Sequence, residues 1–348
     1  MPAAFDKKPR ILIVGVDWLG DVMMSTPLIR AIRKTYPEAF LAYSTTQRCL
    51  PLLKDNPHLD AVIAYDEKVF LLGILDNIRL WFKMREYHFD QAWFLHGSKT
   101  RAFVAFLAGI EKRLGFLRKN RNIFYTHAIT RPSALEVHRG DIYLGLLECK
   151  TPELDAERME ICINAEELQA WQKQAAHLGV EEKRPYIVLH IGGNWEAKRW
   201  DALKFRALIK KLINAGYFCV LCGTKSESEL TQLTLKDIPK TQAITLAGLT
   251  SLRELACLIK NAQLLVSNDS GPIHLAAGVA TPAVGIFGPT SPALTAPRGL
   301  DVFEAVYQRI GCEAPCYYQA CDSIACMDAI SVDDVYIKSI RILEKSPI

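Results

Sequence analysis

The sequence predicts two α/β domains, each built on a parallel sheet. Short apolar runs alternate with helical segments through both halves of the 348-residue chain, which is the pattern of strands joined by crossover helices. A chain of this length exceeds the size at which a single hydrophobic core stops growing, so two domains are expected. Each half also contains an apolar strand that runs into a polar elbow and then a helix, as in sheets that bind ligands at the carboxyl ends of their strands.

In the first half, apolar runs and helical periodicity predict the elements in order. We expect strands near 11–16, 39–44, 61–65 and 90–95. We expect helices near 27–35, 46–53, 70–85, 99–109 and 137–149. For the first helix, Thr26 can serve as the N-cap and Pro27 can occupy the first helical position, where no N–H is needed.

A charged helical stretch at 151–182 contains no expected strand and reads as the bridge between the domains. After it we expect strands at 186–190, 217–221, 243–247, 263–268 and 283–287, and helices at 201–215, 226–233, 251–261, 271–279 and 331–345. The domains are therefore expected at 1–165 and 166–328. The remaining segment, 329–348, is expected to be a helix that packs back on the first domain.

The most informative segment is the elbow Asn268–His274 in the second half. It follows an apolar strand, so Asp269 is delivered to the carboxyl edge of the sheet. Ser270 and Gly271 then open a helix whose first N–H groups have no partner within the helix, which makes an anion site. The local pattern also fits an ordinary N-capped helix of a Rossmann-like domain.

A second elbow follows the apolar run Ile11–Val16, where Asp17 and Asp21 leave the strand and a helix begins. The Asp21 carboxylate has two readings at this stage. It is either a functional acid at the edge of the sheet or a helix-start residue that the helix dipole favours.

Composition and motif content exclude several classes of protein. Half of the residues are apolar, 23% are charged and the net charge is +4, which is too slight to suggest nucleic-acid binding. No apolar run is long enough to cross a bilayer and no signal peptide is apparent, so a cytoplasmic protein is expected. The chain lacks Gly-x-Gly-x-x-Gly, Gly-x4-Gly-Lys-Ser/Thr, His-Glu-x-x-His and Gly-x-Ser-x-Gly motifs, which removes the main support for nicotinamide, ATPase, zincin and hydrolase interpretations.

The ten cysteines fall into two groups. Six are scattered through expected helices, strands and their edges and are expected to be buried thiols: Cys49, Cys149, Cys162, Cys219, Cys222 and Cys257. The other four cluster in a turn-rich stretch near the C-terminus: Cys312, Cys316, Cys321 and Cys326. Their spacing is looser than that of common zinc sites, so we expect no bound metal and a loop held by packing, although a four-thiolate metal site or a redox clasp stays open.

The motifs, taken in order, resemble the heptosyltransferase family of glycosyltransferases, family 9. The segments that carry this resemblance are Trp18–Ser25, Leu95–Ser98, Arg113–Phe116, Lys198–Trp200, Ala247–Gly248, Ser251–Glu254, Asn268–His274 and Phe287–Thr290. The family transfers L-glycero-D-manno-heptose from its ADP sugar to the inner core of lipopolysaccharide. The resemblance implies a GT-B fold, with two Rossmann-like doubly wound domains facing across a cleft, and an inverting reaction that needs no metal or other cofactor.

The resemblance also implies roles for residues at the two elbows. Asp21 would be the general base, since the family places its base on the matching aspartate. The donor site would be formed by Lys198, Arg199, Thr224, Lys225, Thr250, Asp269, Ser270, Gly271 and His274. Within that set, Lys198 and Arg199 would hold the diphosphate, although a solvated basic pair is the simpler interpretation. Asp269 would bond sugar hydroxyls, and His274 would either contact the donor or pack within its helix.

The implied partners are an ADP-heptose donor and a lipid A-Kdo core acceptor. Basic residues of the first domain, Arg113, Arg118 and Lys119, are candidates for binding this anionic acceptor. They and the apolar, basic helix at 70–85 could rest on the inner face of the cytoplasmic membrane, which would make the protein peripheral there. Core packing of that helix is the alternative. Other functions left open are transfer of a different nucleotide-linked sugar, a GT-B-like sugar epimerase and a catalytically silent nucleotide-sugar binder.

Overall fold

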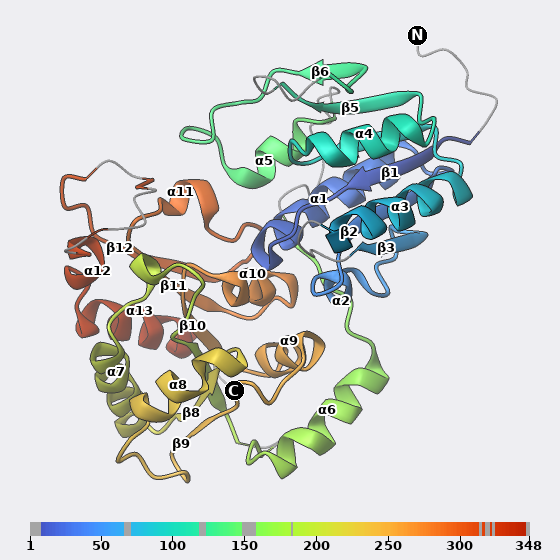
Figure 1. Cartoon of the computed structure of the whole chain (residues 1–348). Coiled ribbons are helices and arrows are strands. Elements are labelled where there is room, and N and C mark those ends of the chain that lie inside the picture. The colour runs from blue at the N-terminus through green and yellow to red at the C-terminus, as the bar shows by residue number, and fades with distance from the viewer. Residues whose placement is uncertain are drawn as a thin grey trace. The chain divides into compact units, whose positions relative to one another are not determined.

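A computed structural model of the chain describes residues 8–65, 71–117, 123–147, 158–181, 184–312, 315–316, 321 and 324–345, with side chains omitted for 71–74. The chain divides into two compact units, Met1–Glu157 and Arg158–Ile348. They run from blue to green and from green to red in Figure 1. The division comes earlier than the boundary expected at residue 165.

The first unit is built on a six-stranded sheet in the order β3-β2-β1-β4-β5-β6, with every neighbouring pair parallel. Its strands are β1 (Arg10–Val14), β2 (Phe40–Thr46), β3 (Ala61–Tyr65), β4 (Gln91–Phe94), β5 (Lys112–Phe116) and β6 (His127–Ile129). The first four match the expected strands. The sequence analysis missed β5, which begins with two cations, and β6, which has only three residues, because neither has an apolar run.

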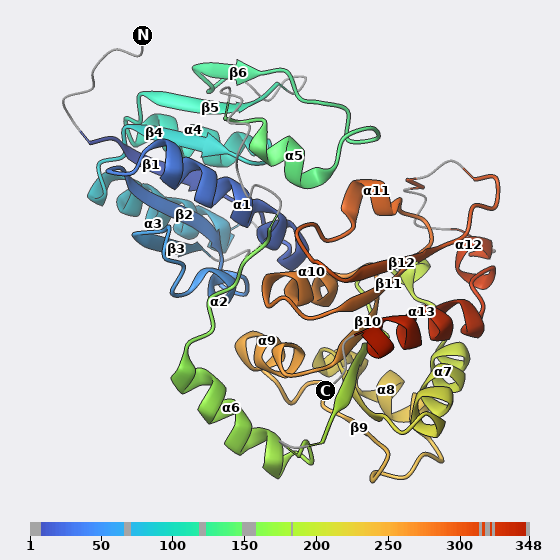
Figure 2. The ribbon, with the colours of Figure 1, turned by 180° about the vertical axis from the view of Figure 1, so that it is seen from behind.

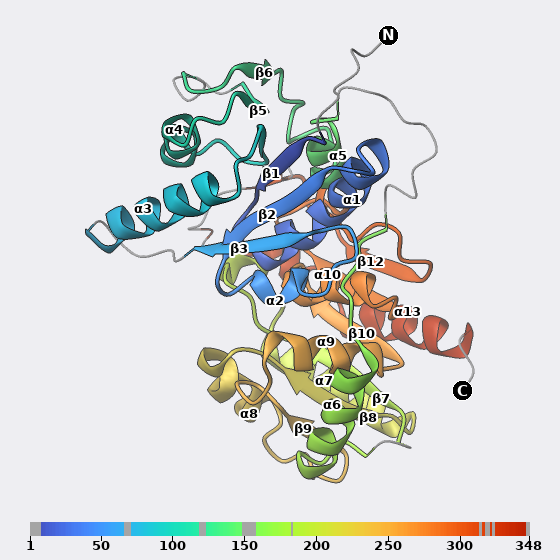
Figure 3. The same cartoon turned by 90° about the vertical axis from the view of Figure 1, so that its right-hand side faces the viewer.

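Helices cover both faces of this sheet, as Figure 3 shows. They are α1 (Leu19–Thr35), α2 (Leu50–Leu53), α3 (Leu71–Glu86), α4 (Lys99–Leu107) and α5 (Arg139–Leu144). Helices α1 and α5 pack together on one face, while α3 and α4 pack together on the other. Alternate strand residues such as Leu12 and Val14 meet Leu80 and Met84 of α3 in the core under the α3–α4 layer.

Helix α1 begins earlier than the sequence predicts, and Pro27 lies inside it rather than at its first position. A proline within a helix removes one backbone hydrogen bond, here the bond to the carbonyl oxygen of Met23. The Thr26 hydroxyl donates to that same oxygen at 2.8 Å. Thr26 is therefore not an N-cap, because its side chain supplies the bond that Pro27 cannot make.

The second unit repeats the architecture with the strand order β12-β11-β10-β7-β8-β9, again parallel throughout. Its strands are β7 (Tyr186–His190), β8 (Phe218–Cys222), β9 (Ala243–Thr245), β10 (Leu264–Asn268), β11 (Ala283–Phe287) and β12 (Phe303–Tyr307). Only β12 was not predicted. The two sheets confirm the expected fold class of two Rossmann-like domains.

The helices of this unit are α6 (Ala165–His177), α7 (Ala202–Asn214), α8 (Ser228–Thr234), α9 (Leu252–Lys260), α10 (Gly271–Gly278), α11 (Pro292–Thr295), α12 (Ala325–Asp328) and α13 (Val332–Lys345). Two single turns of 3-10 helix, η1 (Glu196–Lys198) and η2 (Lys225–Glu227), lie in loops that follow strands. Helices α7 and α13 lie together in Figure 2, and α9 and α10 pack together elsewhere on the unit.

The C-terminal helix α13 packs on the core of the second unit, and the expectation that it packs back on the first domain stays a prediction. Val335, Ile342 and Leu343 are buried in the core that α7 and the sheet of the second unit share. The amphipathic pattern predicted the helix correctly, but such a pattern shows only that one face is covered and not by which partner. Ser331 and Asp334 exchange hydrogen bonds at its start, as the expected cap requires.

No helix in the part of the chain that the structure describes combines the length and the apolar character needed to span a bilayer.

Candidate functional site

In each sheet the order of strands reverses between two central neighbours. Open α/β sheets commonly bind ligands at such a point, at the carboxyl ends of the strands. In the second unit this point lies between β7 and β10. Asn268, fully buried at the end of β10, joins the loops: its amide donates to the carbonyls of Ile191 and Gly192 and accepts from the Trp200 N–H at 3.1 Å. The loop after β7 is therefore fixed against the elbow after β10.

Lys198 and Asp269, both predicted from the sequence, meet at this point. Lys198 Nζ lies 2.6 Å from Asp269 Oδ2, and the Thr290 hydroxyl donates to the same oxygen at 2.5 Å. Asp269 is almost fully buried, whereas Lys198 is partly exposed. The carboxylate thus holds the lysine ammonium at the sheet edge, where an incoming anion could meet it.

Ser270 and Gly271 lie beside this pair at the start of α10. The Ser270 hydroxyl is bonded to His190 Nδ1 at 2.9 Å and donates to the Asn268 carbonyl, and it does not cap the helix. His274 is buried one turn further along α10. Arg199 donates to the Gly193 carbonyl at 2.8 Å, so one of its guanidinium N–H groups already holds the loop.

Glu227, which the sequence analysis missed, ties together the loops after β7 and β8. Its Oε1 accepts from the Gly193 N–H at 2.8 Å, and its Oε2 accepts from the Thr224 N–H and hydroxyl at 2.7 and 2.9 Å. Burial opposes its ionisation, but the nearby His190 ring and the Thr224 hydrogen bonds outweigh it and hold the pKa of Glu227 well below the ordinary value. A Cβ at Gly192 would overlap this carboxylate, at 1.7 Å from Oε1, so glycine is required there.

Thr224, Lys225 and Thr250 lie on neighbouring loops. Thr224 caps η2 and forms a capping box with Glu227. The Gly248 N–H donates to the Gly223 carbonyl at 2.9 Å, which brings the segment before Thr250 against the Thr224–Lys225 loop. Gly248 has a φ of +76° and its added Cβ would lie 2.9 Å from Lys225 Cα, so this approach depends on glycine.

In the first unit, Asp21 lies in the first turn of α1 and is held from α5. Tyr143 donates to Asp21 Oδ1 at 3.0 Å, and an Arg139 guanidinium N–H points at the same oxygen at 3.4 Å. Within the described residues, no hydrogen bond reaches the other oxygen, Oδ2. Burial, and secondarily the Asp21 charge, raise the pKa of Tyr143 well above its ordinary value, so this phenol remains a donor.

A second carboxylate, Asp17, is engaged at the same end of β1. Arg101 of α4 lies 3.1 Å from Asp17 Oδ2, and the Tyr65 hydroxyl donates to Oδ1. The Arg101 guanidinium also stacks over the Tyr65 ring at 4.1 Å. Both oxygens of Asp17 are engaged by these partners, whereas the bonds to Asp21 reach only Oδ1. Asp21 is therefore the better candidate for a carboxylate that acts on a ligand.

Of the three basic residues expected to bind the acceptor, the structure describes only Arg113. Arg113 on β5 donates to the backbone carbonyls of Phe124, Ile110 and Glu111. That guanidinium therefore holds the chain that follows β5, and burial lowers its pKa. Arg118 and Lys119 lie outside the described residues.

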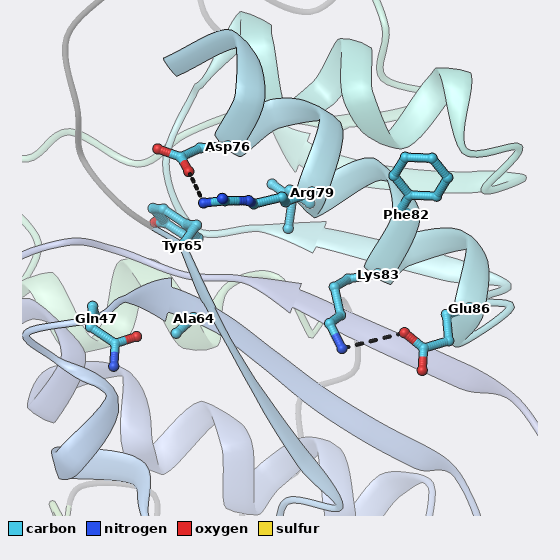
Figure 4. A pocket seen from close by; sticks show the side chains of 9 residues that line it. Gln47, Ala64, Tyr65, Asp76, Arg79, Phe82, Lys83 and Glu86 are labelled. Carbon is cyan, nitrogen blue, oxygen red and sulfur yellow. Dashed lines mark hydrogen bonds and ion pairs between the residues drawn. The ribbon is translucent and has the colours of Figure 1, made fainter. Parts of the chain in front are cut away.

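The first unit also carries a cavity of about 330 Å³ between β3 and α3, shown in Figure 4. Its walls combine apolar and charged side chains: Gln47, Ala64, Tyr65, Asp76, Arg79, Leu80, Phe82, Lys83 and Glu86. The Tyr65 phenol joins this cavity to the Asp17 cluster. Nothing in the sequence indicated it, because the lining residues come from separate elements.

The expectation of buried thiols is confirmed for four of the six cysteines of the first group. Cys49, Cys219, Cys222 and Cys257 are buried, Cys162 is half-buried, and Cys149 lies outside the described residues. Burial raises the pKa of the Cys219 and Cys222 thiols to about 12. Among the C-terminal four, Cys312 and Cys321 are exposed while Cys316 and Cys326 are half-buried.

The Rossmann-like sheets, with their charged clusters where the strand order reverses, match the GT-B-like fold of solved heptosyltransferases, which places the chain among glycosyltransferases. The sequence model of the family described as "Glycosyltransferase family 9 (heptosyltransferase)" matches residues 77–316 of the chain. The chain belongs to glycosyltransferase family 9, the heptosyltransferases, as the sequence resemblance implied.

Individual relatives agree with this assignment. The chain is 30% identical over 309 residues to lipopolysaccharide heptosyltransferase 2 of Salmonella typhimurium, covering 83% of this chain and 85% of the relative. It is 32% identical to lipooligosaccharide heptosyltransferase 2 of Haemophilus influenzae, over 82% and 85% of the two chains. The solved structure of Escherichia coli ADP-heptose lps heptosyltransferase II matches with a TM-score of 0.81 and 25% identity, over 97% and 99%.

Proposed function

We propose that this enzyme transfers a heptose from ADP-L-glycero-D-manno-heptose to the inner core of lipopolysaccharide, with inversion at the anomeric carbon. Family membership and relatives named lipopolysaccharide heptosyltransferase 2 support the donor and the acceptor class. A solved Escherichia coli heptosyltransferase described with ADP-2-deoxy-2-fluoro heptose has the same fold, with a TM-score of 0.65 and 17% identity over 97% and 100% of the chains.

The observation that carries the mechanism is the arrangement of Asp21. One carboxylate oxygen is held by Tyr143 and Arg139, so the second oxygen can accept a proton from a bound hydroxyl. In the proposed step, the acceptor oxygen attacks the anomeric carbon and the bond from that carbon to the diphosphate oxygen breaks. The acceptor proton passes to Asp21, and ADP leaves with both bonding electrons. Tyr143 and Arg139 are positioning residues in this scheme.

The leaving diphosphate is assigned to Lys198 and the first N–H groups of α10, because a cation and a helix N-terminus both favour developing negative charge. Asp269 and Thr290 position Lys198 through contacts on one oxygen. Lys198 and Thr290 both contact Oδ2 of Asp269. The other oxygen, Oδ1, is therefore proposed to accept a hydrogen bond from a sugar hydroxyl. Thr224, Lys225 and Thr250 are proposed to line the nucleoside pocket, with Arg199 and His274 beside the donor.

The acceptor side is proposed to include the basic residues Arg113, Arg118 and Lys119, with Arg113 acting mainly through the loop that it holds. We also propose that the enzyme works at the inner face of the cytoplasmic membrane as a peripheral protein, because the acceptor is a lipid.

A product assay tests the proposal. Purified enzyme is incubated with ADP-heptose, with and without a heptose-deficient core acceptor, and the products are identified by mass spectrometry and by the anomeric configuration in NMR. We expect ADP and a heptosylated acceptor only when the acceptor is present, with the anomeric configuration inverted. Conversion of the sugar without any acceptor would indicate an epimerase. Donor binding without any product would indicate a silent binding protein.

A further inference from the structure

The outward side of the α3–α4 layer is unusually apolar for a surface. Six large side chains are exposed there: Leu75, Ile78 and Phe82 on α3, and Phe103, Phe106 and Leu107 on α4. Phe82 is 60% exposed, Leu75 52% and Phe106 49%. Their spacing places each trio on one stripe of its helix, and the two helices pack side by side. We refer to these six residues as the α3–α4 face.

Core packing does not account for this face. The inward sides of the helices are already buried by other residues, including Leu80, Met84 and Ala105. Scattered exposed apolar residues are normal on a protein surface, whereas a contiguous patch on neighbouring helices marks an interaction site. The sheet beneath α3 therefore accounts for its buried side, but not for the exposed apolar residues on its outer side.

Aromatic residues extend the face toward the chain after β5. Phe103 and Phe106 pack on Phe124, with ring centroids 5.1 and 5.8 Å apart. Ile123, the neighbour of Phe124 in sequence, is 79% exposed.

Cations are interleaved with these apolar residues. Arg79 and Lys83 flank Ile78 and Phe82 on α3, and Lys99 begins α4. The segment 71–117 contains seven Lys and Arg residues and four Asp and Glu residues, in a chain whose net charge is only +4. Of these cations, Arg79 and Lys83 lie next to the exposed apolar residues of α3 in the sequence.

We propose that the α3–α4 face docks on an anionic lipid surface. Lys and Arg can lay their apolar stems along lipid while their charged ends reach anionic headgroups, and Phe and Leu between them enter the interface. Arg79 and Lys83 lie 3.4 and 3.3 Å from Asp76 and Glu86 of the same helix, but their side chains are 76% and 54% exposed, so their charged ends are accessible to anionic headgroups. Arg79 and Lys83 also line the cavity of Figure 4, which offers a hollow for a lipid phosphate beside the apolar stripe.

The proposed membrane contact rests on the proposed function, because it presumes a lipid-linked acceptor. The following test measures membrane binding separately from sugar transfer. The purified chain is floated with vesicles of phosphatidylcholine alone and with vesicles that contain about one third phosphatidylglycerol. We expect binding only to the anionic vesicles, reduced by high salt. Phe82→Ser with Phe106→Ser, and separately Arg79→Glu with Lys83→Glu, should each lower the bound-to-free ratio by at least about tenfold.

Matched controls lie on the second unit. Leu203→Ser with Leu233→Ser removes equally exposed apolar residues, and Lys236→Glu with Lys240→Glu reverses exposed charges, so both should bind as the unchanged protein does. Transfer to a short, lipid-free acceptor should be unchanged in all four variants and reports on the proposed function by itself. Equal binding to both kinds of vesicle, equal losses in the control variants, or a dimer that Phe82→Ser dissociates would overturn the proposal.

Discussion

Lys198 and Asp269 form an ion pair of 2.6 Å between two loops that meet at the reversal point of the second sheet. The resemblance implied that the lysine would hold the diphosphate and the aspartate would bond sugar hydroxyls, and in the structure the two side chains contact each other. The buried carboxylate fixes the ammonium at the place proposed for the diphosphate, and the Thr290 hydroxyl donates to the same oxygen. Each residue therefore sets the electrostatic environment of the other.

This pair leads to a prediction for nucleotide binding. Lys198→Ala should weaken ADP binding by about 1.5–3 kcal/mol, the scale of a charge-assisted hydrogen bond, and should weaken AMP binding less. Adding Asp269→Asn to that variant should restore part of the loss, because an unpaired buried carboxylate would otherwise repel the phosphates. Calorimetry measures each affinity, with Lys211→Ala as the control, since Lys211 pairs with Asp333 on the surface. Equal losses for ADP and AMP would place Lys198 away from the distal phosphate.

For the base, Asp21→Asn should lower turnover by about 10²–10⁴-fold, the range for loss of general-base catalysis, and leave the affinity for ADP unchanged. Asn keeps an oxygen that Tyr143 and Arg139 can bond, so the fold around α1 and α5 should persist. Steady-state kinetics and ADP calorimetry on the same preparation check this. Turnover near that of the unchanged enzyme would remove Asp21 from the mechanism.

Tyr143→Phe tests whether α5 positions the base. It removes one hydrogen bond to Asp21 Oδ1, so kcat should fall by roughly 10-fold or more while the KM for the donor changes little. Tyr186→Phe is the matched control, because Tyr186 is a buried tyrosine of the second unit whose hydroxyl donates to the Leu258 carbonyl. Both variants should lose some stability, but only Tyr143→Phe should lose turnover. A parallel fall in the control would reduce Tyr143 to a packing role.

The sequence predicted more of the fold than of the site. Apolar runs locate strands because burial on both faces of a parallel sheet demands them, and the two elbows follow from chain order alone. Tyr143 and Glu227 could not be found this way, because each acts through contacts with residues far away in sequence or on another loop, and no spacing encodes that. The start of α1 was predicted wrongly for a related reason. The Thr26 hydroxyl replaces the backbone hydrogen bond that Pro27 cannot make, so the helix continues through this proline.

The C-terminal cysteines give a prediction about metal. Their spacing is not that of common zinc modules, and no metal-binding cluster of His, Cys, Asp or Glu occurs within the described ranges. We expect purified enzyme to contain well under about one zinc or iron per chain and to bind ADP after chelation. Cys316→Ser should lower thermal stability more than turnover, because Cys316 is half-buried and a hydroxyl in its place would need a hydrogen-bond partner, whereas the backbone bond to the Pro289 carbonyl is kept. Elemental analysis that finds one metal per chain, lost with activity in Cys312→Ser, would make this a metal site.

Glu227 predicts how stability depends on pH. Its pKa is lowered in the folded chain, so its ionised form stabilises the fold above the unfolded value of about 4.3, and this contribution is lost as the pH falls below it toward the lower folded value. Glu227→Gln should therefore reduce the free energy of unfolding at pH 7 by about 1.5–3 kcal/mol, because an amide cannot accept from both the Gly193 N–H and the Thr224 N–H. The difference from the unchanged enzyme should shrink steadily as the pH is lowered from 5. Urea unfolding at several pH values measures it, with the exposed Glu229→Gln as control. A difference that stays constant across this range would mean that the charge of Glu227 contributes nothing and that only its shape matters to the two loops.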